Sequence, residues 1–246
     1  GVQRKLREKG AKKRNALTID RAQEGAERIA LALYLLKQRS IKVAASDEAE
    51  TLDVEAVLTD WTPTEQQELL GKSLFDPNGV GSVRFHHQAS QEYLAARRLQ
   101  RLRKDGMPLG DLLALLFGEI GGLRVVKPSM APVAAWLSLW DADIRREVLL
   151  REPHLLFRQG LPSAFSVEMR ARILRAYVPQ FAGKDWCRAG VGHGELKRVA
   201  HPERGPVIRE LWLSAYTGHD SRELLLELIW LAAIPSCADL ALSAAL

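Results

Sequence analysis

The spacing of apolar residues predicts a chain built mostly from helices. Within residues 18–38, Ile29 and Leu33 lie one helical turn apart, with small alanines beside them on the same face. Thr18 precedes this run and is a favoured N-cap residue, but Arg21 stands where a capping box requires Glu or Gln. We therefore predict a helix over 18–38 that begins at Thr18 without a full capping box.

Two shorter helices are predicted next. Residues 44–51 are polar and acidic, so we expect a loop, and residues 53–60 predict a short helix capped by the aspartate at its start. Thr62 then caps a further helix, because Pro63 is favoured at the first helical position. Glu65 stands three residues after Thr62 and completes a capping box.

A β-hairpin is predicted between these helices and the next one. Residues 73–76 and 82–85 are short, strand-like runs, and Asn78-Gly79 lies between them. Both of these turn residues tolerate positive φ, which two-residue hairpin turns require. From 88 to 104 the spacing of apolar residues returns to that of a helix.

The remainder of the chain predicts a series of short helices separated by Pro, Gly or polar turns. We expect them near 109–117, 129–139, 141–151, 152–158, 165–179, 204–217, 220–234 and 236–245, with Asp141 and Ser166 as caps. Repetition of helix, turn and helix is typical of an α-solenoid of the HEAT type. Residues 183–203 are the least regular stretch, and we expect a loop or a break between repeats there.

The predicted fold is therefore mainly α. It consists of a basic segment and linking helix at 1–38, a winged-helix-like domain with one small β-hairpin at 39–105, and HEAT-like helical repeats at 106–246.

Composition permits a folded core and locates the charge. The chain has 246 residues, of which 47% are hydrophobic, which is enough for one or two domains. Seven of the 35 basic residues but only one of the 30 acidic residues lie in 1–14, leaving 28 basic and 29 acidic residues elsewhere. The net charge of +5 therefore reflects one segment rather than a basic surface, and we do not expect nucleic-acid binding.

The sequence offers little for catalysis or metal binding. Residues 190–194 are glycine-rich but lack the strand and the GxxxxGK[ST] spacing of a phosphate loop. The spacings of Cys187, His193, His201 and Cys237 fit no zinc motif, and two cysteines are too few for a disulfide framework. We predict no enzyme activity, metal or cofactor for this chain alone.

The expected location is the cytoplasm. No apolar run reaches the roughly 20 residues that span a bilayer, and the basic N-terminus lacks the apolar stretch of a signal peptide. The chain opens on Gly1 rather than Met, so we expect it to be part of a longer protein.

The most distinctive run is 83–98, where a predicted strand passes into a helix. His87 lies at this junction, at which helical N–H groups lack partners and the helix dipole is positive. Such a corner suits an anion, and an imidazole there can donate a hydrogen bond to a phosphate oxygen.

This run resembles the winged-helix signature of NACHT-type STAND ATPases, the signalling nucleotide switches related to Nod-like receptors. Their pattern is Phe-x-His-x-Ser-Phe-Gln-Glu-Tyr-Leu-Ala-Ala. The matching positions here are Phe85, His87, Gln91, Glu92, Tyr93, Leu94, Ala95 and Ala96. Two positions differ from the pattern, since Ala89 stands where Ser is usual and Ser90 where an apolar residue is usual.

The resemblance implies a nucleotide-sensing role for His87, supported by Phe85, Gln91, Glu92 and Tyr93. In such proteins the winged-helix His reaches the β-phosphate of ADP, which an upstream ATPase domain of the same polypeptide holds with its own Walker motifs. The parent protein is therefore expected to bind ADP or ATP with Mg²⁺.

The resemblance also implies partners and a regulatory role. Exchange of ADP for ATP opens such switches and permits homo-oligomerisation, while the helical repeats sense a protein trigger or hold the inactive state. Bacterial or antiviral defence is among the signalling roles implied. Two alternatives remain open: a free-standing helical scaffold for protein–protein interaction, and a winged-helix DNA-binding protein.

Overall fold

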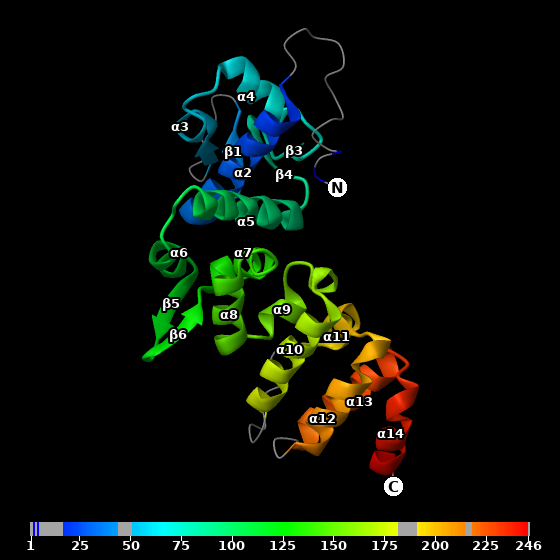
Figure 1. The fold of residues 1–246 in the computed structure, drawn as a ribbon. Coiled ribbons are helices and arrows are strands. Elements are labelled where there is room, and N and C mark those ends of the chain that lie inside the picture. Colours follow the sequence, from blue (N-terminus) through cyan, green and yellow to red (C-terminus); the bar gives the residue numbers. More distant parts are fainter. Residues whose placement is uncertain are drawn as a thin grey trace. The chain divides into compact units, whose positions relative to one another are not determined.

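The structure is a computed structural model that describes residues 17–43, 51–181, 191–214 and 218–245, together with Val2 and Arg4. This part of the chain is mainly helical, as predicted, with two small β-sheets (Figure 1). It folds as two compact units, Gly1–Leu115 and Leu116–Leu246.

Several predictions concern segments outside the described residues. They are the basic run at 1–14 apart from Val2 and Arg4, the acidic loop before Thr51, and the part of 183–203 that contains Cys187 and Gly190.

The first unit combines helices with a four-stranded sheet. Its elements are α2 (Ile19–Leu36), β1 (Ser40–Lys42), β2 (Thr51–Asp53), α3 (Val54–Val57), α4 (Pro63–Leu70), β3 (Phe75–Pro77), β4 (Ser82–Phe85), α5 (Gln88–Lys104) and α6 (Leu109–Leu116). The boundary between the units falls in the last turn of α6. The predicted limits at 1–38, 39–105 and 106–246 stay predictions.

The predicted helix starts in this unit are confirmed. The Thr18 side chain accepts a hydrogen bond from the Arg21 backbone N–H at 3.3 Å, and Asp53 caps α3 in the same way. Thr62 and Glu65 form the reciprocal capping box, with Pro at the first helical position. Local hydrogen bonds of this kind involve residues two or three positions apart, which is why they can be read from the sequence.

The predicted hairpin is also confirmed. β3 and β4 are antiparallel, and Phe75 lies opposite Phe85 with ring centroids 4.8 Å apart. The turn differs from the expected two-residue type, because positive φ falls on Gly79 (70°) and Gly81 (77°) and not on Asn78. A longer loop forms instead, closed by the Asn78 backbone N–H, which donates to the carbonyl of Ser82.

The prediction of a single hairpin is wrong. β1 pairs with β4 and, in parallel, with β2, so the sheet order is β2-β1-β4-β3. A second sheet is formed by β5 (Phe117–Ile120) and β6 (Leu123–Val126). β1 and β2 have three residues each, too few to show an alternating pattern. The β5–β6 turn uses Gly121 and Gly122, both at positive φ, as two-residue hairpin turns require.

The second unit is a succession of short helices. After β5 and β6 it contains η1 (Pro128–Met130), α7 (Ala131–Leu137), α8 (Ala142–Arg151), α9 (Leu155–Arg158), η2 (Pro162–Ala164), α10 (Val167–Tyr177), η3 (Val178–Phe181), α11 (His193–Val199), η4 (Pro202–Arg204), α12 (Gly205–Leu213), α13 (His219–Leu231), η5 (Pro235–Cys237) and α14 (Ala238–Ala245). The predicted caps Asp141 and Ser166 are confirmed. For 183–203 we expected a loop or a break between repeats, and the loop alternative is wrong for His193–Val199, where α11 forms.

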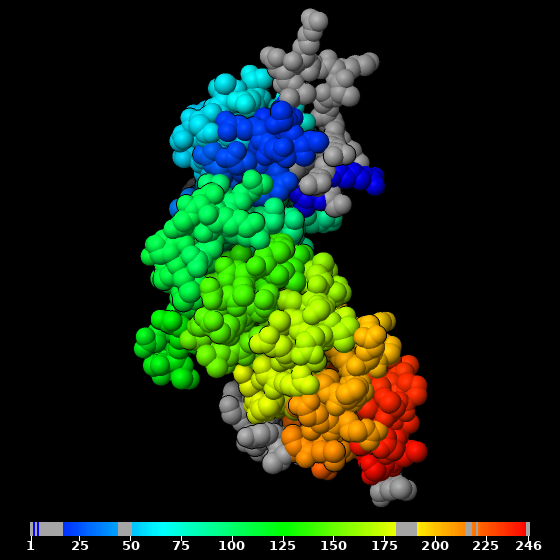
Figure 2. Space-filling view, viewed as in Figure 1, coloured from blue at the N-terminus to red at the C-terminus, as the bar shows by residue number. Residues whose placement is uncertain are grey.

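Neighbouring helices of the second unit pack on one another through apolar side chains. Phe157 of α9 and Tyr177 of α10 are buried, with ring centroids 4.7 Å apart. α12 contacts α13, and α13 contacts α14. Figure 2 shows the colours of this unit following the sequence from green to red, so segments close in sequence are close in space. Its core is therefore built by helices that follow one another, or nearly so, in the chain.

The core of the first unit is organised around α2. This helix makes its most extensive contact with α5, and the two lie side by side in Figure 1. Ala22, Ala26 and Ala30 are buried on α2 at a spacing of four, and their small side chains permit close approach. α2 also contacts α3 and α4, so it joins three helices of the unit.

Gly25 of α2 is required by the packing of Trp61. The indole of Trp61 is 5% exposed, and a Cβ atom added to Gly25 would lie 2.5 Å from its Cη2 and 2.8 Å from a methyl carbon of Leu69. Glycine is unfavourable within a helix, so its presence here reflects this close contact.

We predict that Gly25→Ala lowers the free energy of unfolding by about 1–3 kcal/mol, because the added methyl group overpacks the Trp61 site. Urea denaturation followed by circular dichroism measures the change. Gly110→Ala is the matched control, since no atom lies within 4 Å of an added Cβ on α6, and it should stabilise by about 0.5–1 kcal/mol. Equal stabilisation by both substitutions would contradict the packing role.

Candidate functional site

The predicted functional residue His87 lies at the corner between β4 and α5. It is the N-cap of α5 with extended backbone (φ −128°, ψ 127°), and its carbonyl accepts hydrogen bonds from the N–H groups of Ser90 and Gln91. The imidazole is exposed and makes no capping hydrogen bond to the helix. The backbone of His87 thus starts the helix while its side chain faces solvent.

His86 adds a second imidazole to this corner. Its Nδ1 lies 2.5 Å from Oδ2 of Asp76 on β3, and its ring centroid is 4.0 Å from that of His87. The first turn of α5 contains no acidic residue, so no carboxylate there offsets the positive end of the helix dipole. The corner therefore presents imidazoles and helical N–H groups to any anion that approaches it.

The predicted supporting residues mainly hold the corner in place. Phe85 is buried in the sheet against Phe75. Glu92 is buried on α5. The pKa of Tyr34 on α2 is raised by the burial of its own phenol and then by the negative charge of Glu92. The other two, Gln91 and Tyr93, are half-buried on α5.

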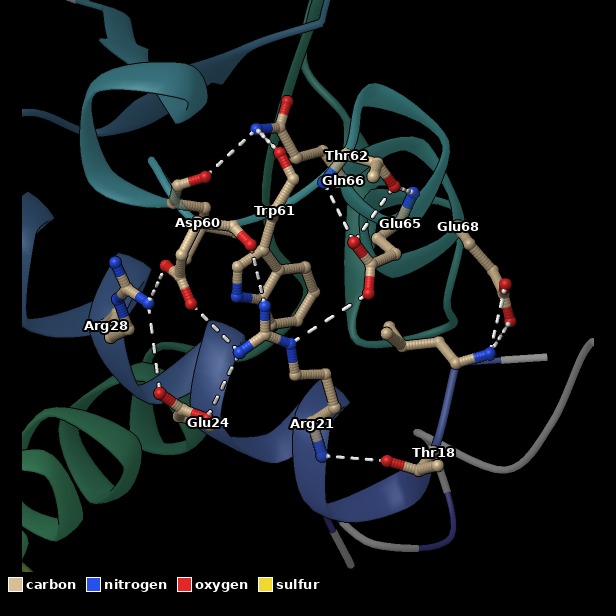
Figure 3. A network of polar contacts seen from close by, with 12 residues as sticks. Thr18, Arg21, Glu24, Arg28, Asp60, Trp61, Thr62, Glu65, Gln66 and Glu68 are labelled. Atoms are coloured by element: carbon tan, nitrogen blue, oxygen red, sulfur yellow. Dashed lines mark hydrogen bonds and ion pairs between the residues drawn. The ribbon is translucent and has the colours of Figure 1, made fainter. Parts of the chain in front are cut away.

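A network of charges joins α2 to the loop after α3, as Figure 3 shows. Nη1 of Arg28 lies 2.5 Å from one carboxylate oxygen of Asp60, and Nη1 of Arg21 lies 3.0 Å from the other. The hydrogen bond from Arg28 is the main reason why the pKa of Asp60 falls to about 2.

The same network encloses Trp61. The guanidinium of Arg21 lies over the indole, 4.5 Å from the ring centroid, and the Gln66 side chain donates to the carbonyl of Leu58 at 3.2 Å. Glu65 is engaged by the capping box. Because these polar groups are occupied by one another, the network stabilises the fold of the unit and offers no binding site.

A groove of about 360 Å³ lies in the first unit beside β1, β2 and α4. Lys42, Asp53 and Glu55 are among its lining residues. Charges of both signs are present, and among the described residues that line the groove no nucleophile stands beside a base. The groove therefore gives no basis for a catalytic proposal.

The zinc-ligand residue types are separated in the described ranges. His193 pairs with Glu227 (Nδ1 to Oε1, 2.8 Å), His201 accepts from the backbone N–H of Glu203, and Cys237 is buried. Over residues 17–43, 51–181, 191–214 and 218–245, no group of three His, Cys, Asp or Glu side chains could hold a metal ion. Within the same ranges, every helix is too short or too polar to cross a bilayer.

Arg204 is a notable residue that the sequence did not indicate. It is 0% exposed in η4, and its three guanidinium nitrogens have no hydrogen-bond partner within the described part of the chain. Burial, and then the charge of Arg170, lower its pKa to about 10, so it remains a cation at neutral pH. A buried cation without a counter-ion destabilises a fold. In the sequence Arg204 lies in a polar turn beside Gly205, where exposure is the ordinary expectation.

We predict that Asp60→Asn reduces the loss of stability on acidification. The folded pKa of Asp60 lies below its ordinary value of 3.8, so its stabilising effect is complete above that value and disappears as pH falls towards about 2. Urea unfolding of both proteins across this range should show their stabilities converging. Asp105→Asn is the control, because within residues 17–43, 51–181, 191–214 and 218–245 this exposed carboxylate forms no hydrogen bond or ion pair. Parallel curves for the parent and Asp60→Asn would contradict the role of Asp60.

We predict that Arg204→Met raises the free energy of unfolding by about 1–4 kcal/mol, because an apolar side chain of similar length replaces a buried cation. Urea denaturation of the whole chain measures it. Arg198→Met is the control, because Arg198 donates to the carbonyls of Arg158 and Gly160 and its loss should destabilise by about 1 kcal/mol. Destabilisation by Arg204→Met would contradict the prediction.

No family model, curated protein sequence or solved structure matches the chain. The resemblance to NACHT-type proteins is carried by the eight matching positions within 85–96.

Proposed function

We propose that this chain is the regulatory, nucleotide-sensing portion of a NACHT-type STAND signalling ATPase. In this proposal His87 contacts the β-phosphate of ADP held by an upstream ATPase domain of the same polypeptide. The helical second unit holds the inactive state or receives a protein trigger. The exposed imidazole of His87 at the start of α5 is the observation that carries the proposal.

The order of elements supports a winged-helix-like first unit. Two short helices, α3 and α4, precede the β3–β4 hairpin, and α5 follows it directly. β1 pairs with β4 and extends the hairpin into a sheet. The buried pair of Phe75 and Phe85 then sets the end of β4, and with it the position of the next two residues.

The chemistry of the corner suits a diphosphate. A neutral imidazole donates one hydrogen bond to a phosphate oxygen, and a protonated imidazole adds a charge. His86 is held by Asp76, so its ring supports that of His87 from the side. Backbone N–H groups in the first turn of α5 point towards the same end of the helix.

The second unit fits a sensor or autoinhibitory role of the HEAT-like kind. Its α-helices pack on the next or the next-but-one helix in the chain, as expected of an α-solenoid. Such units offer long surfaces to protein partners.

The DNA-binding alternative receives little support. In a winged-helix DNA-binding protein α4 would be the recognition helix, but α4 carries Glu65 and Glu68 and no basic residue. Carboxylates there would repel the phosphate backbone. A helical scaffold without nucleotide remains the second candidate, favoured by the large exposed apolar residues Leu150, Leu213 and Trp230 of the second unit.

We predict that His87→Ala in the longer protein weakens ADP binding by about 1–3 kcal/mol, the range for losing a charge-assisted hydrogen bond. Isothermal titration calorimetry of ADP on both proteins measures the difference. His193→Ala is the matched control, because that exposed imidazole lies in the second unit and pairs with Glu227. Equal ADP affinities for the parent and His87→Ala would remove His87 from the mechanism.

The reading frame upstream of Gly1 distinguishes the two candidate functions. A strand followed by GxxxxGK[ST] and an acidic Walker B strand supports the nucleotide switch. A start codon close to Gly1 supports the free-standing scaffold.

A further inference from the structure

A groove of about 430 Å³ in the second unit is lined by arginine and apolar side chains from two helices. α8 and α10 contact each other and form its two walls. The lining residues are Arg146, Leu149, Leu150, Arg172, Arg175 and Ala176.

The two helices contribute to the groove in the same way. On α8 the lining residues stand at positions 146, 149 and 150, and on α10 they stand at 172, 175 and 176. A spacing of three and four places each set on one helix face. Each set begins with an arginine and ends with an apolar residue.

The apolar part of the groove is open to solvent. Leu150 is 69% exposed, and its neighbour Leu149 is half-buried. Ala176 lies opposite on α10 and is also half-buried. A large exposed leucine beside a concave surface is typical of a contact for an apolar side chain of a partner.

The charged residues that line the groove are all arginines, and not all of them are engaged in ion pairs. α8 and α10 together carry six arginines against Asp143, Glu147 and Glu168. Arg175 is fixed by Glu210, whose Oε2 lies 2.8 Å from Nη2, and Arg146 lies 3.1 Å from Asp143 at the surface. Arg172 is exposed and has no hydrogen bond or ion pair within the described residues. Arg172 is therefore available for a carboxylate, and Arg146 can exchange its exposed partner for one.

We propose that the α8–α10 groove binds an acidic amphipathic segment of a partner protein. An apolar side chain of that segment covers Leu150 and Leu149, and its carboxylates pair with Arg172 and Arg146. This combination favours a peptide over a nucleic acid, because a phosphate backbone has no apolar group to cover the exposed Leu150. The assignment does not depend on His87 or on nucleotide.

Binding is tested with a synthetic peptide of Leu and Glu whose leucines recur at helical spacing, labelled with fluorescein and titrated with the whole chain. Fluorescence anisotropy should rise on addition of the chain, and the affinity should fall with added salt. The same peptide with Lys in place of Glu should not bind. A fluorescein-labelled DNA duplex of similar charge should bind at least about tenfold more weakly than the acidic peptide.

Two substitutions locate the site. Arg172→Glu and Leu150→Glu should each weaken binding of the acidic peptide by at least about tenfold. Arg124→Glu and Leu123→Glu on β6 are matched controls, because Leu123 is 71% exposed and Arg124 is also at the surface. All four side chains are exposed, so the fold should be retained, and circular dichroism checks it.

Three results would overturn the proposal. They are no anisotropy change with the acidic peptide at about 1 mM chain, stronger binding of the DNA duplex, and equal losses for the groove and β6 variants. Loss of peptide binding in the groove variants with ADP binding intact in the longer protein would separate this site from the proposed nucleotide role.

Discussion

The first unit depends on the contact between the Trp61 indole and the backbone of α2 at Gly25. The ring occupies space that any side chain at position 25 would fill, so the loop after α3 approaches α2 closely. Arg21 and Arg28 then reach Asp60 beside that ring and hold the loop by charge. Since α2 also packs along α5, this contact relates α3 and α4 to the helix that begins at His87.

In the candidate site, buried and exposed residues have different roles within the short run 85–92. Phe85 is buried in the sheet and Glu92 is buried on α5, so both restrict where the strand ends and how the helix lies. His87, between them, keeps an exposed imidazole at a positive helix end. A rigid support for an exposed polar group is what recognition of a ligand from another domain requires.

Two arginines of the second unit lie in opposite environments, one buried and one exposed. Arg204 is buried with no hydrogen-bond partner among the described residues, at a cost to stability, whereas Arg172 is exposed in the groove that Leu150 also lines. Burial penalises a cation, while exposure next to apolar surface makes it available to a carboxylate. An arginine side chain therefore destabilises the fold when it is buried in η4 and can recognise a carboxylate when it is exposed on α10.

The sequence by itself determined the features that depend on near neighbours. The caps at Thr18, Asp53 and Thr62, and the β3–β4 hairpin, were predictable because their hydrogen bonds join residues close in the chain. Only the tertiary structure decided the pairing of β1 with β2 and β4, the contact of the Trp61 indole with Gly25, the burial of Arg204 and the α8–α10 groove. Each of these brings together residues distant in sequence, and no local pattern of apolar and polar residues records which distant surfaces will meet.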